Sequence, residues 1–342
     1  MSGDTRDVGD VVSTLLGTAA SIVSSTPTST GGGRNSRTWT MQAGGRLVFV
    51  KETRRDDKRD RTACEVAFAS FLRCHGWQHS PVPIAHDAAA RIAVYEQIDG
   101  TAIDIVTAEH VAQAAAFARA LRDMAQHADA ASLIDAADAA FDLADHIAIV
   151  DARVQRVAAE CSSGPASSFV ADELVPAWRA VRDEAKRHAE AGAGGDRVRA
   201  LSAARVLSPS DFGFHNALVQ RDGRLVFFDF EYAGWDHPAK MLVDFFLQPA
   251  HTADRSFIGS MADAIAGPAD VSDLLAAAAQ LHPVLVVKWA AIALNALLPP
   301  PPSSTASQPR GDVDDYTQLA PRTAAALRVA RTFLTRPRTF LP

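Results

Sequence analysis

The sequence predicts an α+β protein with a small antiparallel sheet near the N-terminus and a larger, mainly helical remainder. Residues 38–95 hold short β-prone runs separated by glycine turns. Beyond Thr107, apolar residues recur at the spacing of helical faces through most of the chain. Inside this helical part, an Asp-Gly pair at 222–223 lies between two short apolar runs and predicts one hairpin. We therefore expect two lobes, an N-lobe of residues 1–97 and a C-lobe of residues 98–342.

Length and composition narrow the class of protein. The chain has 342 residues, 48% of them hydrophobic, and can bury a sizeable core. The net charge of −6 argues against nucleic acid as the main partner. Three cysteines without metal-ligand spacing favour a reducing, cytoplasmic setting. We expect no membrane span, because no apolar run is long enough, and we expect a monomer or a homodimer.

The N-terminal part combines a glycine-rich loop with two β-prone runs. The loop leads into the run Thr38–Met41, and a Gly-Gly turn at 44–45 separates that run from Arg46–Lys51. Glycine lets backbone N–H groups approach phosphate oxygens closely, but glycines alone more often form a flexible hairpin tip. No Gly-Lys-Ser/Thr follows, so the loop is not a P-loop. The loop residues that could face a phosphate are Gly31, Gly32, Gly33 and Asn35.

A lysine and a glutamate stand at positions where apolar side chains are expected. Lys51 ends its run and shares a face with Leu47 and Phe49 by the two-residue alternation of a strand. Glu65 lies on the apolar stripe of a helix expected over residues 62–74. An isolated buried charge is costly, so one hypothesis pairs the two side chains. The other, equally open, has both reaching out to water.

A polar crossover follows the next predicted strand, Ile92–Tyr95. If the boundary between the lobes lies at Glu96–Gly100, the exposed backbone there can hydrogen-bond the edge of an adenine ring. Beyond it, Thr107 can cap a helix whose first turn contains Glu109. Further helices are expected over residues 137–160, 170–190, 240–247, 274–298 and 321–334.

The strongest chemical signal lies between residues 207 and 246. Asp211 and Asn216 precede a hairpin with strands at 217–220 and 225–229, and Asp229 ends the second strand. One residue enters the hairpin and the other leaves it, so Asn216 and Asp229 can converge. Two carboxylates and an amide oxygen suit a hard cation such as Mg²⁺. The alternative is a purely structural role, in which Asp211 caps a turn and Asp229 only ends a strand.

Taken together, and in their order along the chain, these motifs resemble those of the aminoglycoside phosphotransferase and choline kinase-like family. Its members are small-molecule relatives of the protein kinases. An Asp-x-x-x-x-Asn segment followed by an acidic residue after a strand is the arrangement of kinase catalytic loops. The resemblance runs from about residue 31 to residue 246 and implies a bilobal, protein kinase-like fold. The matching segments are GGGRN (31–35), Lys51, Glu65, YEQIDG (95–100), SDFGFHN (210–216) and DFEYAGWDHPAKMLVDF (229–245).

The resemblance implies transfer of a γ-phosphate from ATP, or from GTP, to a hydroxyl of a small molecule such as an aminoglycoside, a sugar or an amino alcohol. Asp211 would position the hydroxyl and take its proton. Asn216 and Asp229 would bind Mg²⁺. Lys51, held by Glu65, would grip the α- and β-phosphates.

The nucleotide would meet two further parts of the chain. Gly31, Gly32, Gly33 and Asn35 would cover the phosphates, and the main chain of Glu96 and Ile98 would bind the base. One departure is Pro209, at the position where the family usually has a histidine. Two alternatives remain: a catalytically inactive nucleotide-binding protein, and a protein kinase. The short distance from Asp229 to the next apolar helix speaks against the latter, because it leaves no room for a long activation loop.

Overall fold

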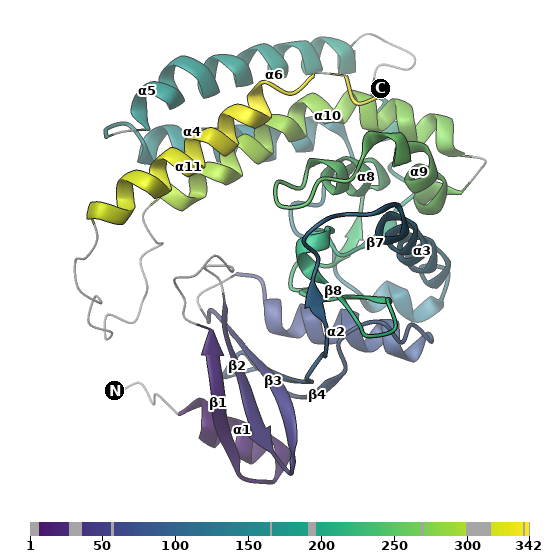
Figure 1. Cartoon of the computed structure of the whole chain (residues 1–342). Helices are drawn as coiled ribbons and strands as arrows, with labels where there is room; N and C mark the ends of the chain where they lie inside the picture. Colours follow the sequence, from purple (N-terminus) through teal and green to yellow (C-terminus); the bar gives the residue numbers. More distant parts are fainter. Residues whose placement is uncertain are drawn as a thin grey trace. The chain divides into compact units, whose positions relative to one another are not determined.

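The computed structural model describes residues 7–26, 36–55, 58–164, 166–190, 196–267, 270–298, 316–337 and 339–341 (Figure 1). Gly31, Gly32, Gly33 and Asn35 lie outside the described residues. The chain forms two compact units, and each is described by itself. Unit 1 comprises Met1–Ala137 and Leu207–Trp235, and unit 2 comprises Asp138–Val206 and Asp236–Pro342.

A five-stranded antiparallel sheet opens unit 1, with the strand order β1-β2-β3-β5-β4. The expected hairpin is confirmed: β2 pairs with β3 across Gly44 and Gly45, whose φ angles of 55° and 81° are typical of a tight hairpin turn. Two strands, β1 and β4, were not predicted. The strands are β1 (Ala20–Thr26), β2 (Ser36–Ala43), β3 (Arg46–Thr53), β4 (Pro83–Asp87) and β5 (Ile92–Glu96).

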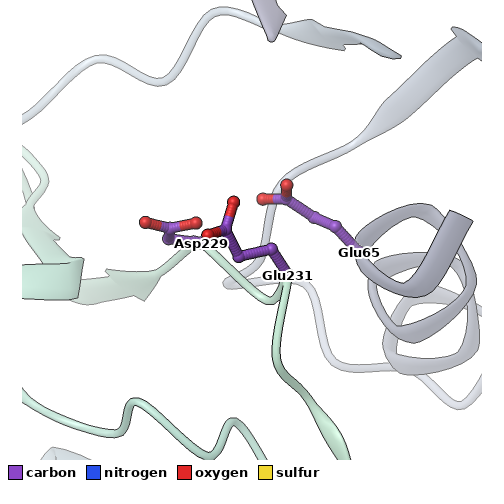
Figure 2. Close-up of side chains that lie close together, drawn as sticks. All are labelled: Glu65, Asp229 and Glu231. Atoms are coloured by element: carbon purple, nitrogen blue, oxygen red, sulfur yellow. The ribbon is translucent and has the colours of Figure 1, made fainter. Parts of the chain in front are cut away.

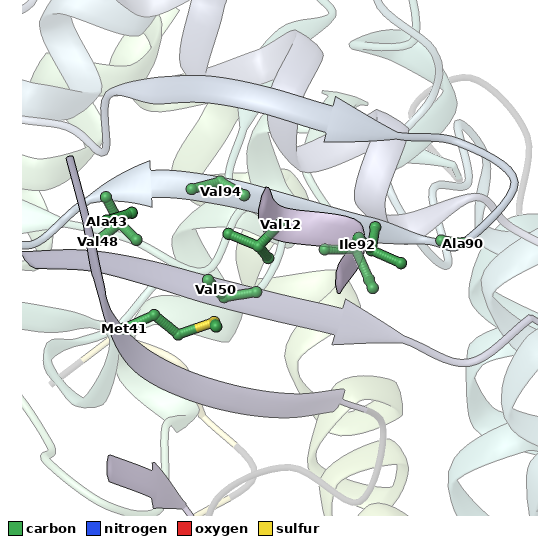
Figure 3. Close-up of a cluster of buried hydrophobic side chains, with 9 residues drawn as sticks. Val12, Met41, Ala43, Val48, Val50, Ala90, Ile92 and Val94 are labelled. Carbon is green, nitrogen blue, oxygen red and sulfur yellow. The ribbon is translucent and has the colours of Figure 1, made fainter. Parts of the chain in front are cut away.

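One face of this sheet is covered by the helix α1 (Val8–Leu16). Val12 of that helix packs against Val48 and Val50 of β3, which are fully buried (Figure 3). The residues that alternate with them point to the other face, where Leu47 is 45% exposed. Lys51 therefore lies on the sheet face opposite the α1 core, and its apolar neighbours there are only partly buried.

The rest of unit 1 combines helices with the hairpin predicted around Asp222 and Gly223. The helix α2 (Arg61–Cys74) agrees with its prediction, and α3 (Ala108–Met124) begins at the expected cap, where the Thr107 side chain accepts from the His110 N–H. The strand β6 (Thr101–Ala102) pairs with β8 (Ala217–Val219), which pairs with β9 (Leu225–Phe227). Gly100 is required before β6, because a Cβ there would lie 2.8 Å from the Leu218 side chain.

Unit 2 is helical, and α10 lies at its centre, packed against α4, α6, α8, α9 and α11. The helix expected from residue 137 begins only at Leu143, and α9 was not predicted. Its main elements are α4 (Leu143–Glu160), the π-turn η2 (Val170–Leu174), α6 (Val175–Glu190), α7 (Arg197–Ala200), α8 (Pro238–Leu247), α9 (Ile258–Ala266), α10 (Val271–Leu294) and α11 (Tyr316–Leu334). The expected class, an N-terminal antiparallel sheet followed by a mainly helical region, is confirmed.

One expectation about apolar runs is wrong. The segment Val271–Leu297, which contains α10, is long and apolar enough to cross a membrane by length and composition alone. Within its most apolar window, 61% of the residues are buried in the protein, as in the core helix of a globular fold. Length and composition are therefore weak evidence for a span here.

Candidate active site

The loop before the hairpin is held by its own side chains and backbone. It follows the short strand β7 (Val206–Ser208), where the Ser208 hydroxyl accepts from the Ser210 N–H at 2.9 Å. The Pro209 carbonyl accepts a hydrogen bond from the Asp211 N–H at 2.8 Å. Ser210 takes a left-handed conformation with φ of 65°, and Asp229 does so with φ of 64°. Each non-glycine residue in this region costs about 1–3 kcal/mol, and such residues concentrate at functional sites.

The candidate base Asp211 is in contact with Asn216. The Asn216 amide nitrogen donates to the Asp211 main-chain carbonyl at 3.0 Å and to its Oδ2 at 3.3 Å. The amide therefore turns its nitrogen, and not its oxygen, toward Asp211. The short turn η3 (Phe214–Asn216) carries both Asn216 and His215, and the His215 ring also meets Oδ2 of Asp211, at 3.2 Å.

A second group of side chains surrounds the ammonium of Lys51. Its Nζ lies 2.9 Å from Glu65 Oε2, 2.5 Å from Asp229 Oδ1 and 2.9 Å from Glu231 Oε2. Figure 2 shows that the three carboxyl groups lie close together, one on a side chain from α2 and two on side chains from the segment after β9. Of the two open hypotheses for Lys51 and Glu65, the structure shows the ion pair, and both residues are buried.

Only one of these contacts has the geometry of a hydrogen bond. Lys51 donates to Asp229, whereas the Oε2 atoms of Glu65 and Glu231 have no hydrogen-bond partner among the described residues. Their contacts with Lys51 are therefore ion pairs held by charge and burial. Asp229 is the most accessible of the three carboxylates, with a side chain 38% exposed against 5% and 6%.

The electrostatics of the cluster are dominated by burial and by an excess of acidic groups. Burial would lower the pKa of Lys51, but the carboxylates of Asp229, Glu65 and Glu231 outweigh it and hold that pKa well above its usual value. Burial raises the pKa of the Glu65 carboxyl to about 7, although Lys51 acts in the opposite direction. Arg61 lies 3.4 Å from Glu231. Within the part of the chain that the structure describes, the cations Lys51 and Arg61 thus face three carboxyl groups, which favours a further cation.

Glu231 was missed by the sequence reasoning. It is buried beside Lys51 and Arg61, and the Arg61 guanidinium also lies 5.0 Å from the ring of Tyr232. The sequence does contain a signal for Glu231, since a second acidic residue follows Asp229 two positions later, in the order Asp229-Phe230-Glu231. Between them, the Phe230 ring packs against α2, with its centroid 5.2 Å from that of Phe68. The Glu231 contact therefore depends on a packed aromatic anchor between the two acids.

The residues predicted to bind metal have suitable chemistry. Asn216 supplies an amide oxygen and Asp229 a half-exposed carboxylate, and oxygen ligands of this kind suit Mg²⁺. A different set of oxygens, from Glu65, Asp229 and Glu231, lies within 4.8 Å of one another. The Lys51 ammonium already pairs with all of that set. The donor types of Asn216 and Asp229 therefore suit a metal ion, and Asp229 is the residue that the two sets share.

Some of the main-chain groups predicted to bind the nucleotide base already make hydrogen bonds within the protein. The Glu96 N–H donates to the Val82 carbonyl at 3.0 Å, so only the Glu96 carbonyl could serve an amino group of a base. The Ile98 carbonyl accepts from the Gln97 side chain at 3.5 Å. Before them, Tyr95 is buried with a hydroxyl that has no hydrogen-bond partner among the described residues, and burial raises its pKa well above the usual value.

A hollow of about 490 Å³ in unit 1 is separate from these residues. Trp77, Gln113 and Phe227 contribute to its lining, together with the tip of the hairpin at 222–224. Gln113 holds that hairpin by donating to the Gly223 carbonyl and accepting from the Leu225 N–H. None of its lining residues belongs to the Lys51 cluster or to the Asp211 loop, so this hollow is not the candidate site.

Solved structures of kinases resemble the chain over nearly its whole length. Spectinomycin phosphotransferase APH(9)-Ia, in complex with ADP and spectinomycin, has a TM-score of 0.62 at 12% identity, covering 97% of this chain and 95% of that chain. APH(2'')-IIa in complex with gentamicin has 0.57 at 14% identity, with 98% of each chain covered. The ethanolamine kinase of Plasmodium vivax has 0.53 at 13% identity, covering 95% and 83%. At these identities the likeness establishes a kinase-like fold.

At the level of sequence, no curated protein matches the chain. Residues 28–250 do match a protein family, the phosphotransferase enzyme family abbreviated APH. This segment contains Lys51, Glu65, Asp211, Asn216 and Asp229, and it spans well over half of the chain. The protein belongs to the phosphotransferase enzyme family.

Proposed function

We propose that the protein transfers the γ-phosphate of ATP to a hydroxyl group of a small molecule. Family membership supports phosphoryl transfer as the reaction class. The observation that carries the finer proposal is the contact of one buried ammonium, Lys51, with both Glu65 and Asp229. Phosphoryl transfer needs a cation to hold the phosphates and a carboxylate to hold the metal, and this contact brings both to one place.

Each residue of the site then has a role. Lys51, held by Glu65, grips the α- and β-phosphates, and Asp211 aligns the acceptor hydroxyl and takes its proton. Asn216 and Asp229 hold Mg²⁺, which when bound neutralises charge on the transferred phosphoryl group. These residues supply positioning and charge, which carry most of the catalysis in this reaction class.

The nucleotide and its acceptor meet other parts of the chain. Gly31, Gly32, Gly33 and Asn35 cover the phosphates, while the Glu96 carbonyl and the Ile98 N–H bind the base. Two of the similar structures contain spectinomycin and gentamicin, and the third is an ethanolamine kinase. All three of these small molecules combine hydroxyl groups with amines. An amine-bearing alcohol is therefore the first acceptor class to test, with neutral sugars second. From the cysteine usage we infer that the reaction takes place in the cytoplasm.

The test is ADP release from MgATP against a panel of acceptors, namely aminoglycosides, amino alcohols, hexoses, heptoses and nucleosides. Asp211→Asn serves as the control, and GTP replaces ATP in a parallel series. Acceptor-dependent ADP release that disappears in the variant supports the proposal and identifies the acceptor class. Failure of the parent protein to bind either MgATP or MgGTP contradicts it. Binding without turnover on any acceptor favours the inactive, nucleotide-binding alternative.

A further inference from the structure

The Asp211 carboxylate receives two donors on one oxygen. His215 Nε2 lies 3.2 Å from Oδ2, and the Asn216 amide nitrogen lies 3.3 Å from the same atom. Both side chains come from η3, the turn that leads into the hairpin. The χ2 torsion of an aspartate side chain varies over a broad range. Hydrogen-bond donors to Oδ2 therefore help to set the orientation of the carboxylate plane.

The surroundings of the His215 ring assign its proton. Its Nδ1 is buried and has no hydrogen-bond partner among the described residues. A proton on Nδ1 would be buried without an acceptor, whereas a proton on Nε2 meets the carboxylate of Asp211. The hydrogen-bond partners therefore assign the Nε2–H tautomer, in which His215 donates to Asp211.

The two donors differ in what else they do. Asn216 also donates to the Asp211 main-chain carbonyl, at the shorter distance of 3.0 Å, and its side-chain bond to Oδ2 is the longer one. Among the described residues, the His215 side chain makes one hydrogen bond, to Oδ2 of Asp211. Its side chain is 27% exposed, so it is not a core residue. The ring of His215 is thus committed to the orientation of the Asp211 carboxylate.

We propose that His215 is a positioning residue for the catalytic base, holding the Asp211 carboxylate through an Nε2–H hydrogen bond in the plane that meets the acceptor hydroxyl. The catalytic role of His215 rests on the proposed function of Asp211. The hydrogen bond and the tautomer of His215 can be tested without that function, because they are properties of the protein alone. Loss of one such bond to a charged group should lower kcat by about tenfold.

The experiment compares His215→Leu, which keeps side-chain bulk but has no donor, with His215→Gln, whose amide can reach a similar position. The matched control is His75→Leu. His75 also pairs with an aspartate, with Nε2 at 2.9 and 3.1 Å from the Asp129 oxygens, and neither residue belongs to the proposed site. Steady-state kcat and KM are measured with the acceptor identified from the panel, together with MgATP affinity and the melting temperature.

We expect His215→Leu to lose about tenfold in kcat while its MgATP affinity and melting temperature stay near those of the parent. His215→Gln should recover most of the loss, and His75→Leu should keep the parent kcat. An unchanged kcat in His215→Leu overturns the proposal. So does a kcat loss that follows the melting temperature and is not recovered by His215→Gln, because that pattern indicates a purely structural role.

A second measurement needs no turnover. Nitrogen-15 NMR of the histidine rings, at about pH 8 where ordinary histidines are neutral, reports which ring nitrogen carries the proton. We expect the Nε2–H form for His215 in the parent, and a shift of its Nε2 and Hε2 signals in Asp211→Ala because the hydrogen bond to the carboxylate is lost. An Nδ1–H form, or a signal indifferent to Asp211→Ala, contradicts the positioning role even when no acceptor is known. Absence of turnover in the parent contradicts only the proposed function.

Discussion

The Lys51 ammonium donates a hydrogen bond to Asp229 across 178 positions of the chain. Lys51 belongs to β3 and Asp229 follows β9, and both lie in the same compact unit. The contact joins the side chain proposed to hold phosphate to the one proposed to hold metal. A substitution at either residue should therefore change nucleotide binding, and it should also change the charge balance around the buried Glu65 and Glu231.

Removing the Asp229 carboxylate should abolish the Mg²⁺ dependence of ATP binding. In Asp229→Ala, Lys51 keeps its ion pairs with Glu65 and Glu231, so the buried charges remain paired. Isothermal titration with ATP, with and without Mg²⁺, measures the effect. The control is Asp222→Ala, in the exposed turn of the same hairpin. If Asp229→Ala binds MgATP as tightly as the parent does, the metal assignment is wrong.

Replacing Asp211 by asparagine should stop the chemistry and spare the nucleotide. The amide keeps the shape of the carboxylate but cannot take a proton, and general bases contribute about 100- to 10,000-fold in rate. We expect Asp211→Asn to lose at least about 100-fold in kcat, with MgATP affinity nearly intact. Single-turnover transfer and equilibrium binding separate the two effects. Lost nucleotide affinity would assign Asp211 a different role.

Replacing Lys51 by alanine should impair ATP use more than replacing Glu65 by alanine does. Lys51→Ala removes the cation shared by three carboxylates, so ATP use should fail and stability should fall by about 3–5 kcal/mol, as when a buried ion pair is broken. Glu65→Ala leaves Lys51 with Asp229 and Glu231, so the rise in KM for ATP should be smaller. Urea unfolding and ATP kinetics measure both, with the exposed Lys58→Ala as control. A loss in Glu65→Ala as large as that in Lys51→Ala would indicate a separate function for the glutamate.

Acid should weaken the fold through His237. This buried residue caps α8, with Nδ1 accepting from the Ala239 N–H at 3.1 Å and Nε2 donating to the Val198 carbonyl at 2.9 Å. Burial lowers its pKa to about 4, whereas an unfolded chain has a histidine pKa of about 6.5. Between these values the unfolded chain binds more protons, so the stability present above about pH 6.5 is lost as the pH falls toward 4.

A His237→Asn variant isolates that contribution. Asparagine can cap a helix but does not titrate, so the free energy of unfolding should depend less on pH than in the parent. Urea unfolding at several values between pH 7 and pH 4.5 measures the difference, which should amount to at most about 3 kcal/mol. Parallel pH curves for parent and variant would show that protonation of His237 does not contribute.

Local signals made much of the fold predictable. The Gly-Gly turn before β3, the Thr107 cap of α3 and the Asp-Gly hairpin act within a few residues, so their geometry follows from neighbours in the sequence. The strands β1 and β4 were missed, because edge strands depend on a partner and their own composition is only weakly β-prone. The pairing of Lys51 with Glu65 was foreseen as one of two hypotheses, since burial makes an unpaired charge costly.

The sequence by itself determined the order of the chemical groups along the chain and the class of reaction that such groups serve. Only the tertiary structure decided which groups meet. Glu231 joins Lys51 because packing of Phe230 turns the acid toward β3, and His215 meets Asp211 because one short turn folds back on the loop. Contacts between distant residues depend on how the elements pack, and no pattern of neighbouring residues contains that information.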